Sequence, residues 1–201
     1  ELLNSAFFNQ ICIKDSSKFK LPDSMEKDYP GYGYDKENQP LSLMNIQYEY
    51  DLLSGNWSSL EFTKVTRNDQ ADSKETIDKI QKKSLYIRDL GYVTSTYLKA
   101  IEDKEAYYVN RLPHTTNIYQ MRDGELQLID WKSLHKNMDK AGQTHKEIEV
   151  YMGKEKKLKT RMVMFRVDEK VYQKRIRKAA DGGKRKDGYS ISKEYKAKAH
   201  Y

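Results

Sequence analysis

The strongest constraint on this chain is an apolar-x-apolar-x-Asp pattern that occurs twice, at positions 74 residues apart. Residues 11–15 read ICIKD and residues 85–89 read LYIRD. Apolar residues at every second position predict a β-strand, in which both apolar side chains and the aspartate share one face. We therefore predict that Asp15 and Asp89 each end a strand, on the face directed towards the core.

The spacing of apolar residues also predicts the elements in the first half of the chain. Alternation at every second residue predicts strands, and a change to helical spacing predicts helices between them. Besides the two patterns above, the predicted elements are strands at 44–50, 60–62 and 106–112, helices at 70–83 and after Thr94 or Ser95, and a loop at 29–40. This order, βββαβαβ, predicts an α/β fold with a mixed sheet.

The second half of the chain is predicted to be rich in β-structure. Two hairpins are expected, at 118–129 and 147–167, and Asp168 can cap a basic helix that runs to about residue 180. The segment 181–201 has no hydrophobic face, so we expect it to be poorly ordered. The predicted domains are therefore a core at 1–112, a β-rich subdomain at 113–180 and a basic end at 181–201.

Positive charge is concentrated towards the end of the sequence. The chain carries 37 Lys+Arg against 30 Asp+Glu, but residues 154–201 alone carry 17 against 6. Such an excess is expected of a segment that binds a polyanion, and equally of a solvated surface. The candidates for contacts with a nucleic-acid backbone are Lys156, Lys157, Lys159, Arg175 and Arg177.

Composition excludes several classes of protein. No run of about 18 apolar residues is present, so we expect no membrane partner. The first residues lack the basic and apolar regions of a signal peptide, and one cysteine excludes an internal disulfide framework. A cytoplasmic location is therefore expected.

The two aspartates predict a metal site. A buried carboxylate without a partner is costly, so each aspartate needs a cation or hydrogen-bond donors. If their strands are neighbours, Asp15 and Asp89 converge at one end of the sheet and a divalent cation relieves their repulsion. Oxygen ligands suit Mg²⁺ or Mn²⁺, and a pair of these ions about 3.5–4 Å apart supports in-line phosphoryl transfer. The alternative is that each aspartate only caps a turn.

Four segments carry a more specific signal. They read KDSS at 14–17, YEYDLLSG at 48–55, IRDLGY at 87–92 and AYYVNRL at 106–112. Together they resemble consecutive motifs of bacterial insertion-sequence transposases of the DDE (Asp-Asp-Glu) class. The resemblance covers essentially the whole chain, and the last two segments are its most specific part.

The resemblance implies a fold, an activity and partners. It implies an RNase H-like core with a β-rich insertion from about residue 113, and Asp15 and Asp89 as the first two catalytic carboxylates. It also implies a two-metal Mg²⁺ or Mn²⁺ site, and double-stranded DNA, as transposon ends and target, for a partner. The intact enzyme would cut and rejoin DNA in the bacterial cytoplasm, at the nucleoid, and a homodimer is left open.

The sequence departs from the family at the third carboxylate. The family has a Glu on a helix with the pattern Tyr-x-x-Arg-x-x-x-Glu-x-x-x-x-x-x-Lys, and neither Tyr189 nor Tyr195 begins such a pattern. We therefore expect a fragment whose core is incomplete at its C-terminus, which lacks the N-terminal DNA-binding region and is inactive alone.

Two further residues have a functional and a structural interpretation. Arg111 lies after the second aspartate and suits either a DNA phosphate or an ion pair within the protein. Trp131 could stack on a displaced base, or it could anchor a small subdomain.

One alternative function belongs to a different class. The chain would then be a non-catalytic nucleic-acid-binding module, with a basic C-terminal section that grips the backbone and with structural aspartates. It predicts DNA binding that depends on salt and is unaffected by EDTA. A residual RNase H-like nuclease is a weaker third option.

Overall fold

The computed structural model describes residues 7–34, 40–153, 155, 158–183 and 190–201. The chain divides into two compact units, unit 1 at residues 1–113 and unit 2 at residues 114–201. In the part of the chain that the structure describes, no helix is long and apolar enough to cross a membrane.

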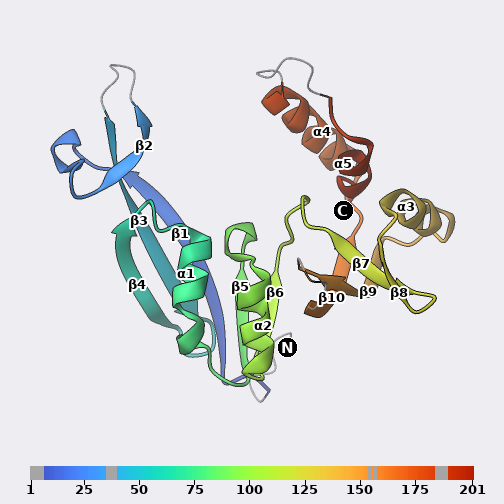
Figure 1. Ribbon diagram of the computed structural model, residues 1–201, viewed down its shortest axis with the longest axis horizontal. Helices are drawn as coiled ribbons and strands as arrows, with labels where there is room; N and C mark the ends of the chain where they lie inside the picture. Colours follow the sequence, from blue (N-terminus) through green and yellow to red (C-terminus); the bar gives the residue numbers. More distant parts are fainter. Residues whose placement is uncertain (1–6, 35–39, 154, 156–157, 184–189) are drawn as a thin grey trace. The chain divides into compact units, whose positions relative to one another are not determined.

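Unit 1 is built on a mixed β-sheet with the order β3-β1-β5-β6, in which β2 and β4 also pair with β3 (Figure 1). The central strand β1 runs antiparallel to β3 and parallel to β5, and β5 runs parallel to β6. The strands are β1 at Gln10–Lys20, β2 at Pro30–Tyr34, β3 at Pro40–Asp51, β4 at Asn56–Lys64, β5 at Ser84–Arg88 and β6 at Tyr107–Asn110. The sheet confirms the predicted mixed α/β class and is consistent with an RNase H-like core.

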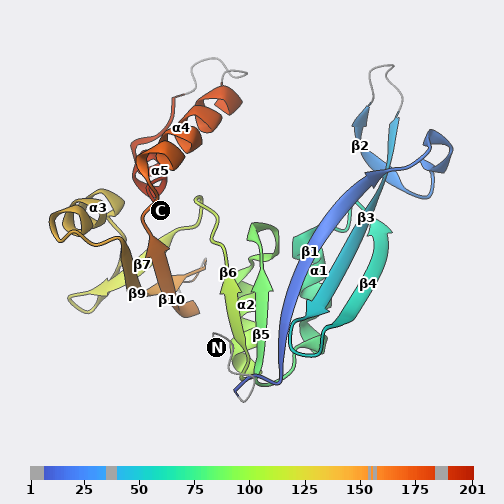
Figure 2. The same cartoon turned by 180° about the vertical axis from the view of Figure 1, so that it is seen from behind.

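Helices α1 (Asp69–Glu75) and α2 (Ser95–Asp103) cover one face of this sheet, and Figure 2 shows the other face. Both begin at a side-chain cap: Asn68 accepts a hydrogen bond from Ala71 N, and Thr94 accepts one from Tyr97 N. The described part of unit 1 also contains short 3₁₀ turns, η1 at Asp23–Met25, η2 at Ile77–Lys79 and η3 at Leu90–Tyr92.

The covered face is opposite to the predicted one. On β1, Cys12 is 0% exposed and Lys14 is 4% exposed, whereas Ile13 is 36% exposed and Asp15 is also exposed. Ile11, near the start of the strand, is buried on the predicted face. The helices pack on the even-numbered side chains, so the aspartate lies on the open face. Asp15 also does not end its strand, because β3 continues to pair with β1 as far as Lys20.

Two local predictions in unit 1 are wrong in detail. The loop predicted at 29–40 contains β2, an edge strand, a position in which Pro30 is tolerated. The helix predicted at 70–83 ends at Thr76, whose hydroxyl donates to the carbonyl of Asp72 at 2.8 Å. Such a bond from side chain to backbone competes with continued helix.

In its described residues, unit 2 contains an antiparallel four-stranded sheet with the order β10-β9-β7-β8 and three helices. Both predicted hairpins are present, and Asp168 caps α4 by accepting from Val171 N at 2.7 Å. The elements are β7 at Ile118–Arg122, β8 at Glu125–Leu128, α3 at Trp131–Lys140, β9 at His145–Met152, β10 at Leu158–Phe165, α4 at Glu169–Gly183 and α5 at Lys193–Lys198.

Helices α3 and α5 are absent from the sequence prediction. Asp130 caps α3 by accepting from the backbone N–H groups of Lys132 and Ser133. Helix α5 lies in the segment 181–201, for which poor order was expected, and it packs against α3. Its support comes from residues distant in sequence, since the His200 ring just after it stacks on His135 and Tyr172.

Candidate active site

Strands β1 and β5 bring Asp15 and Asp89 next to each other. Their parallel register pairs residues with a constant offset of 74 positions, and the last pair is Lys14 with Arg88. Asp89 follows directly in extended backbone, so it continues this register beside Asp15. Because residues paired across parallel strands direct their side chains to one face, both carboxylates lie on the open face. Both are exposed.

Each aspartate has its own partners in the structure. Asp15 accepts a hydrogen bond from Ser16 N at 2.8 Å and one from the Tyr48 hydroxyl at 3.4 Å. Asp89 Oδ1 lies 3.2 Å from NH1 of Arg111, and these side chains are 53% and 72% exposed. Arg111 suited either a DNA phosphate or an ion pair within the protein. The structure contains the ion pair, and the guanidinium also faces solvent.

The donor chemistry of this pair fits a hard divalent cation. Two adjacent carboxylates offer oxygen ligands and two negative charges, which suit Mg²⁺ or Mn²⁺. Within the described ranges, no group of three or more His, Cys, Asp or Glu residues could hold a metal ion. The aspartates therefore supply two protein ligands of a site rather than a complete set.

The opposite face of the sheet holds a buried layer of charges. Lys14 Nζ lies 2.6 Å from Asp72 Oδ2, and NH2 of Arg67 lies 3.0 Å from Asp72 Oδ1. Arg88 forms a second ion pair with Glu49 at 2.5 Å. These pairs satisfy charged groups that the helices cover, as burial requires.

Cys12 lies in the same layer. Burial, with Glu49 nearby as a smaller cause, raises the pKa of its thiol to about 12. A thiol in this state is not a nucleophile near neutral pH.

The basic residues predicted to bind nucleic acid have different surroundings. Lys159 on β10 is exposed and pairs with Glu149 at 2.9 Å, a hydrogen bond that raises the pKa of the lysine. Arg177 is exposed on α4, whereas the half-buried Arg175 donates to the carbonyl of Ala199 at 3.0 Å. Lys156 and Lys157 lie outside the described residues.

Trp131 occupies the first position of α3 and is partly covered. The Lys198 ammonium lies 5.3 Å from the centroid of its ring, and the centroid of the Tyr201 ring is 6.5 Å away. Both partners belong to the end of the chain, so the ring contacts the α5 segment as an anchor would.

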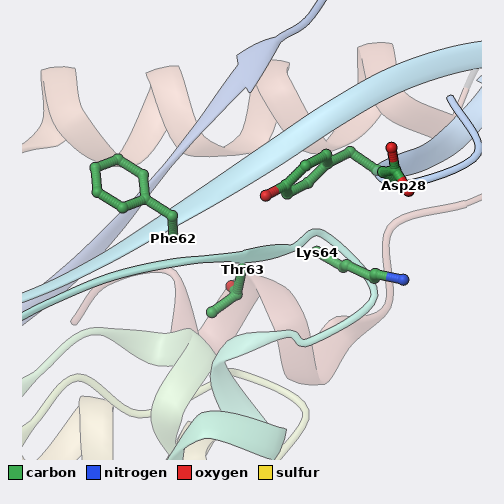
Figure 3. A pocket seen from close by; sticks show the side chains of 5 residues that line it. Asp28, Phe62, Thr63 and Lys64 are labelled. Carbon is green, nitrogen blue, oxygen red and sulfur yellow. The ribbon is translucent and has the colours of Figure 1, made fainter. Parts of the chain in front are cut away.

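An open pocket lies elsewhere in unit 1 (Figure 3). It contains none of the predicted site residues, so it does not belong to the candidate site. Its lining consists of Asp28, Tyr29, Phe62, Thr63 and Lys64.

Two residues near the aspartates were not predicted from the sequence to belong to the site. Tyr48 was predicted only as a strand position, and its contact with Asp15 depends on the register of β1 with β3. Asp69, at the start of α1, accepts a hydrogen bond from Ser16 at 2.9 Å. No local pattern specifies either contact.

Comparisons with known proteins show the family of this chain. The sequence family described as "Transposase DDE domain" matches residues 6–179. The transposase for insertion sequence element IS231B of Bacillus thuringiensis subsp. berliner is 31% identical over 186 residues, which cover 86% of this chain and 38% of that protein. The IS231E transposase of Bacillus thuringiensis subsp. finitimus is 32% identical, covering 86% and 38%. The IS1151 transposase of Clostridium perfringens is 27% identical, covering 90% and 40%. The chain thus spans about two fifths of the length of these curated relatives.

Proposed function

Because the chain belongs to the transposase DDE domain family, we propose that Asp15 and Asp89 are the metal-binding carboxylates of a DNA transposase. One observation supports the proposal: the register of β1 and β5 pairs Lys14 with Arg88, and Asp15 and Asp89 are the next residues along the two strands. The metal would be Mg²⁺ or Mn²⁺. When bound, such ions make water a stronger nucleophile and stabilise charge on phosphate oxygens.

The residues around the pair suit this role. The Ser16 N–H and the Tyr48 hydroxyl both donate to the Asp15 carboxylate and so orient it. Arg111 balances the charge of Asp89 and, being exposed, can turn its guanidinium to a DNA phosphate. The protein itself forms no covalent intermediate in the proposed reaction.

The proposed reaction is cut-and-paste transposition in two displacements at phosphorus. Water attacks the phosphodiester at the transposon end, and the 3′-oxygen of the DNA leaves as a hydroxyl. That hydroxyl then attacks a phosphodiester of the target and displaces its 3′-oxygen. Because two carboxylates are fewer than the three of a DDE site, we infer that this chain alone does not cut DNA.

Unit 2 is proposed to contact the DNA backbone. It carries 22 Lys+Arg against 12 Asp+Glu, and Lys159 and Arg177 on it are exposed. This charge is also what favours the second candidate function, a nucleic-acid-binding module without catalysis. The two candidates differ in the role of the aspartates and not in DNA binding.

The test compares Mn²⁺ affinity for the native chain, Asp15→Asn and Asp89→Asn, measured by EPR of the free ion. Each substitution removes one charged oxygen ligand, so each is expected to weaken binding by at least about tenfold. Asp78→Asn, an exposed residue of unit 1, serves as the charge-matched control and should bind Mn²⁺ as the native chain does.

Equal affinity in all four proteins would overturn the metal assignment. If DNA binding then also persisted in EDTA, the non-catalytic module would be the better description.

A further inference from the structure

The side chain of Asp69 touches the strand that carries Asp15. Asp69 is the first residue of α1, on the covered face, and its Oδ1 accepts hydrogen bonds from Ser16 Oγ at 2.9 Å and Gln47 Nε2 at 3.0 Å. Ser16 directly follows Asp15, and its side chain points to the opposite face of the sheet. Asp69 therefore contacts β1 next to Asp15, the first candidate metal ligand, from the opposite face of the sheet.

The same carboxylate also borders the segment that follows Asp89. A Cβ at Gly91 would overlap Oδ2 of Asp69, so the backbone there approaches as closely as only glycine permits. Tyr92 is 1% exposed, and its hydroxyl donates to Oε1 of Gln47 at 2.6 Å. Gln47 thus connects Tyr92 back to Asp69.

Helix α1 adds a further contact to this segment. The hydroxyl of Ser73 lies 2.9 Å from the carbonyl oxygen of Asp69 and 3.1 Å from that of Tyr92. Burial, followed by the nearby Asp69 charge, raises the pKa of Tyr92, so its phenol remains a neutral donor. The first turns of α1 therefore contact both aspartate-bearing segments.

The charges nearby have other partners. Lys14 and Arg67 both pair with Asp72, one turn along α1, and the described ion pairs do not include Asp69. The contacts of Asp69 are thus directed hydrogen bonds and a close backbone approach.

We propose that Asp69 is a positioning residue that fixes the separation of Asp15 and Asp89 from the opposite face of the sheet. This inference rests on the proposed function, since it concerns the spacing of the two metal ligands. The carboxylates of Asp15 and Asp89 repel each other before a cation binds. The contacts of Asp69 on the opposite face of the sheet resist their separation. Partners behind metal ligands commonly change metal affinity by about 10- to 100-fold.

The test measures Mn²⁺ affinity of the full 201-residue chain by EPR of the free ion. Asp69→Ala is expected to weaken binding by about tenfold. Asp69→Asn keeps an oxygen that can accept from Ser16 and Gln47, so its affinity is expected to stay close to native. Asp78→Asn is again the control.

A second pair of variants tests the tie directly. Gly91→Ala pushes a methyl group against Asp69 and is expected to weaken Mn²⁺ binding. The double variant Gly91→Ala, Asp69→Ala should bind no more weakly than Asp69→Ala alone, because the overlap is gone. If Asp69→Ala does not fold, Ser16→Ala removes one donor only, and a smaller loss in the same direction is expected.

The outcomes separate this proposal from the proposed function. Native affinity in Asp69→Ala, together with loss in Asp15→Asn and Asp89→Asn, would overturn the positioning role alone. Equal loss in Asp69→Asn and Asp69→Ala would also overturn it, since a distant charge and not a hydrogen-bonded tie would then be the cause. Faster amide exchange at residues 90–92 in metal-free Asp69→Ala is the expected second readout.

Discussion

The two units of this chain place their charged side chains in opposite ways. Unit 1 carries 15 Lys+Arg against 18 Asp+Glu and buries several of them, including Lys14, Asp72 and Arg88. Unit 2 carries 22 against 12, and its cross-strand pair Lys159–Glu149 has both side chains more than half exposed. A count of charges therefore does not reveal which of them stabilise the fold.

The difference follows from what covers each sheet. In unit 1 the helices lie on the polar face, so charged groups must satisfy each other away from water. In unit 2 the buried positions are apolar, as in Ile118, Val150 and Met164, and charged residues such as Lys159 and Glu149 face solvent. Each unit contains one tryptophan, Trp57 or Trp131, so fluorescence can follow their unfolding separately.

The largest effect is expected for Asp72→Asn in unit 1. The substitution leaves Lys14 buried without its charged partner, and breaking a buried pair in this way costs about 3–5 kcal/mol. Urea unfolding followed by Trp57 fluorescence, in a Trp131→Phe background, measures the loss. The exposed Asp78→Asn is the control, and a loss no greater than that of the control would contradict the burial of this pair.

A smaller effect is expected from His200 in unit 2. Burial, followed by His135 and Arg166, lowers its pKa from the ordinary 6.5. The unfolded chain therefore takes up a proton near pH 6.5 that the folded unit resists, so stability is full above this pH and falls as the pH drops below it. Urea midpoints from Trp131 fluorescence, in a Trp57→Phe background, should decrease from pH 7 to pH 5. His200→Phe keeps a ring against Tyr172, and an undiminished decrease in that variant would exclude His200 as the cause.

The smallest effect is expected for Glu149→Gln in unit 2. It removes the partner of Lys159, but both side chains face solvent, where ion pairs contribute little. The urea midpoint, followed through Trp131, should remain that of the native chain. A shift as large as that of Asp72→Asn would erase the contrast between the two units.

Much of the fold could be predicted from the sequence because its signals are local. Alternation identified the strands around Asp15 and Asp89, and Thr94 and Asp168 marked the starts of two helices. The helix at Trp131–Lys140 was missed although Asp130 is an ordinary cap, because the segment between the hairpins is short and polar.

The candidate site was predictable in its two aspartates and not in their surroundings. The motifs containing Asp15 and Asp89 are local in sequence. The two aspartates are 74 positions apart, which is also the offset between paired residues of β1 and β5. Tyr48 is 33 positions from its partner Asp15, and Asp69 is 53 positions from its partner Ser16. Such contacts are set by the pairing of strands and the docking of α1, for which no local pattern exists.

By itself, the sequence determined the strands that lead to Asp15 and Asp89, although β1 continues past Asp15 to Lys20. Only the tertiary structure decided which face of the sheet is covered. Period-two alternation separates the faces but does not orient them, and the apolar face was the natural prediction for the core. Helices α1 and α2 cover the other face, where the charges satisfy one another in the pairs Lys14–Asp72 and Arg88–Glu49. The aspartates are left exposed, on the side where a metal ion and DNA can reach them.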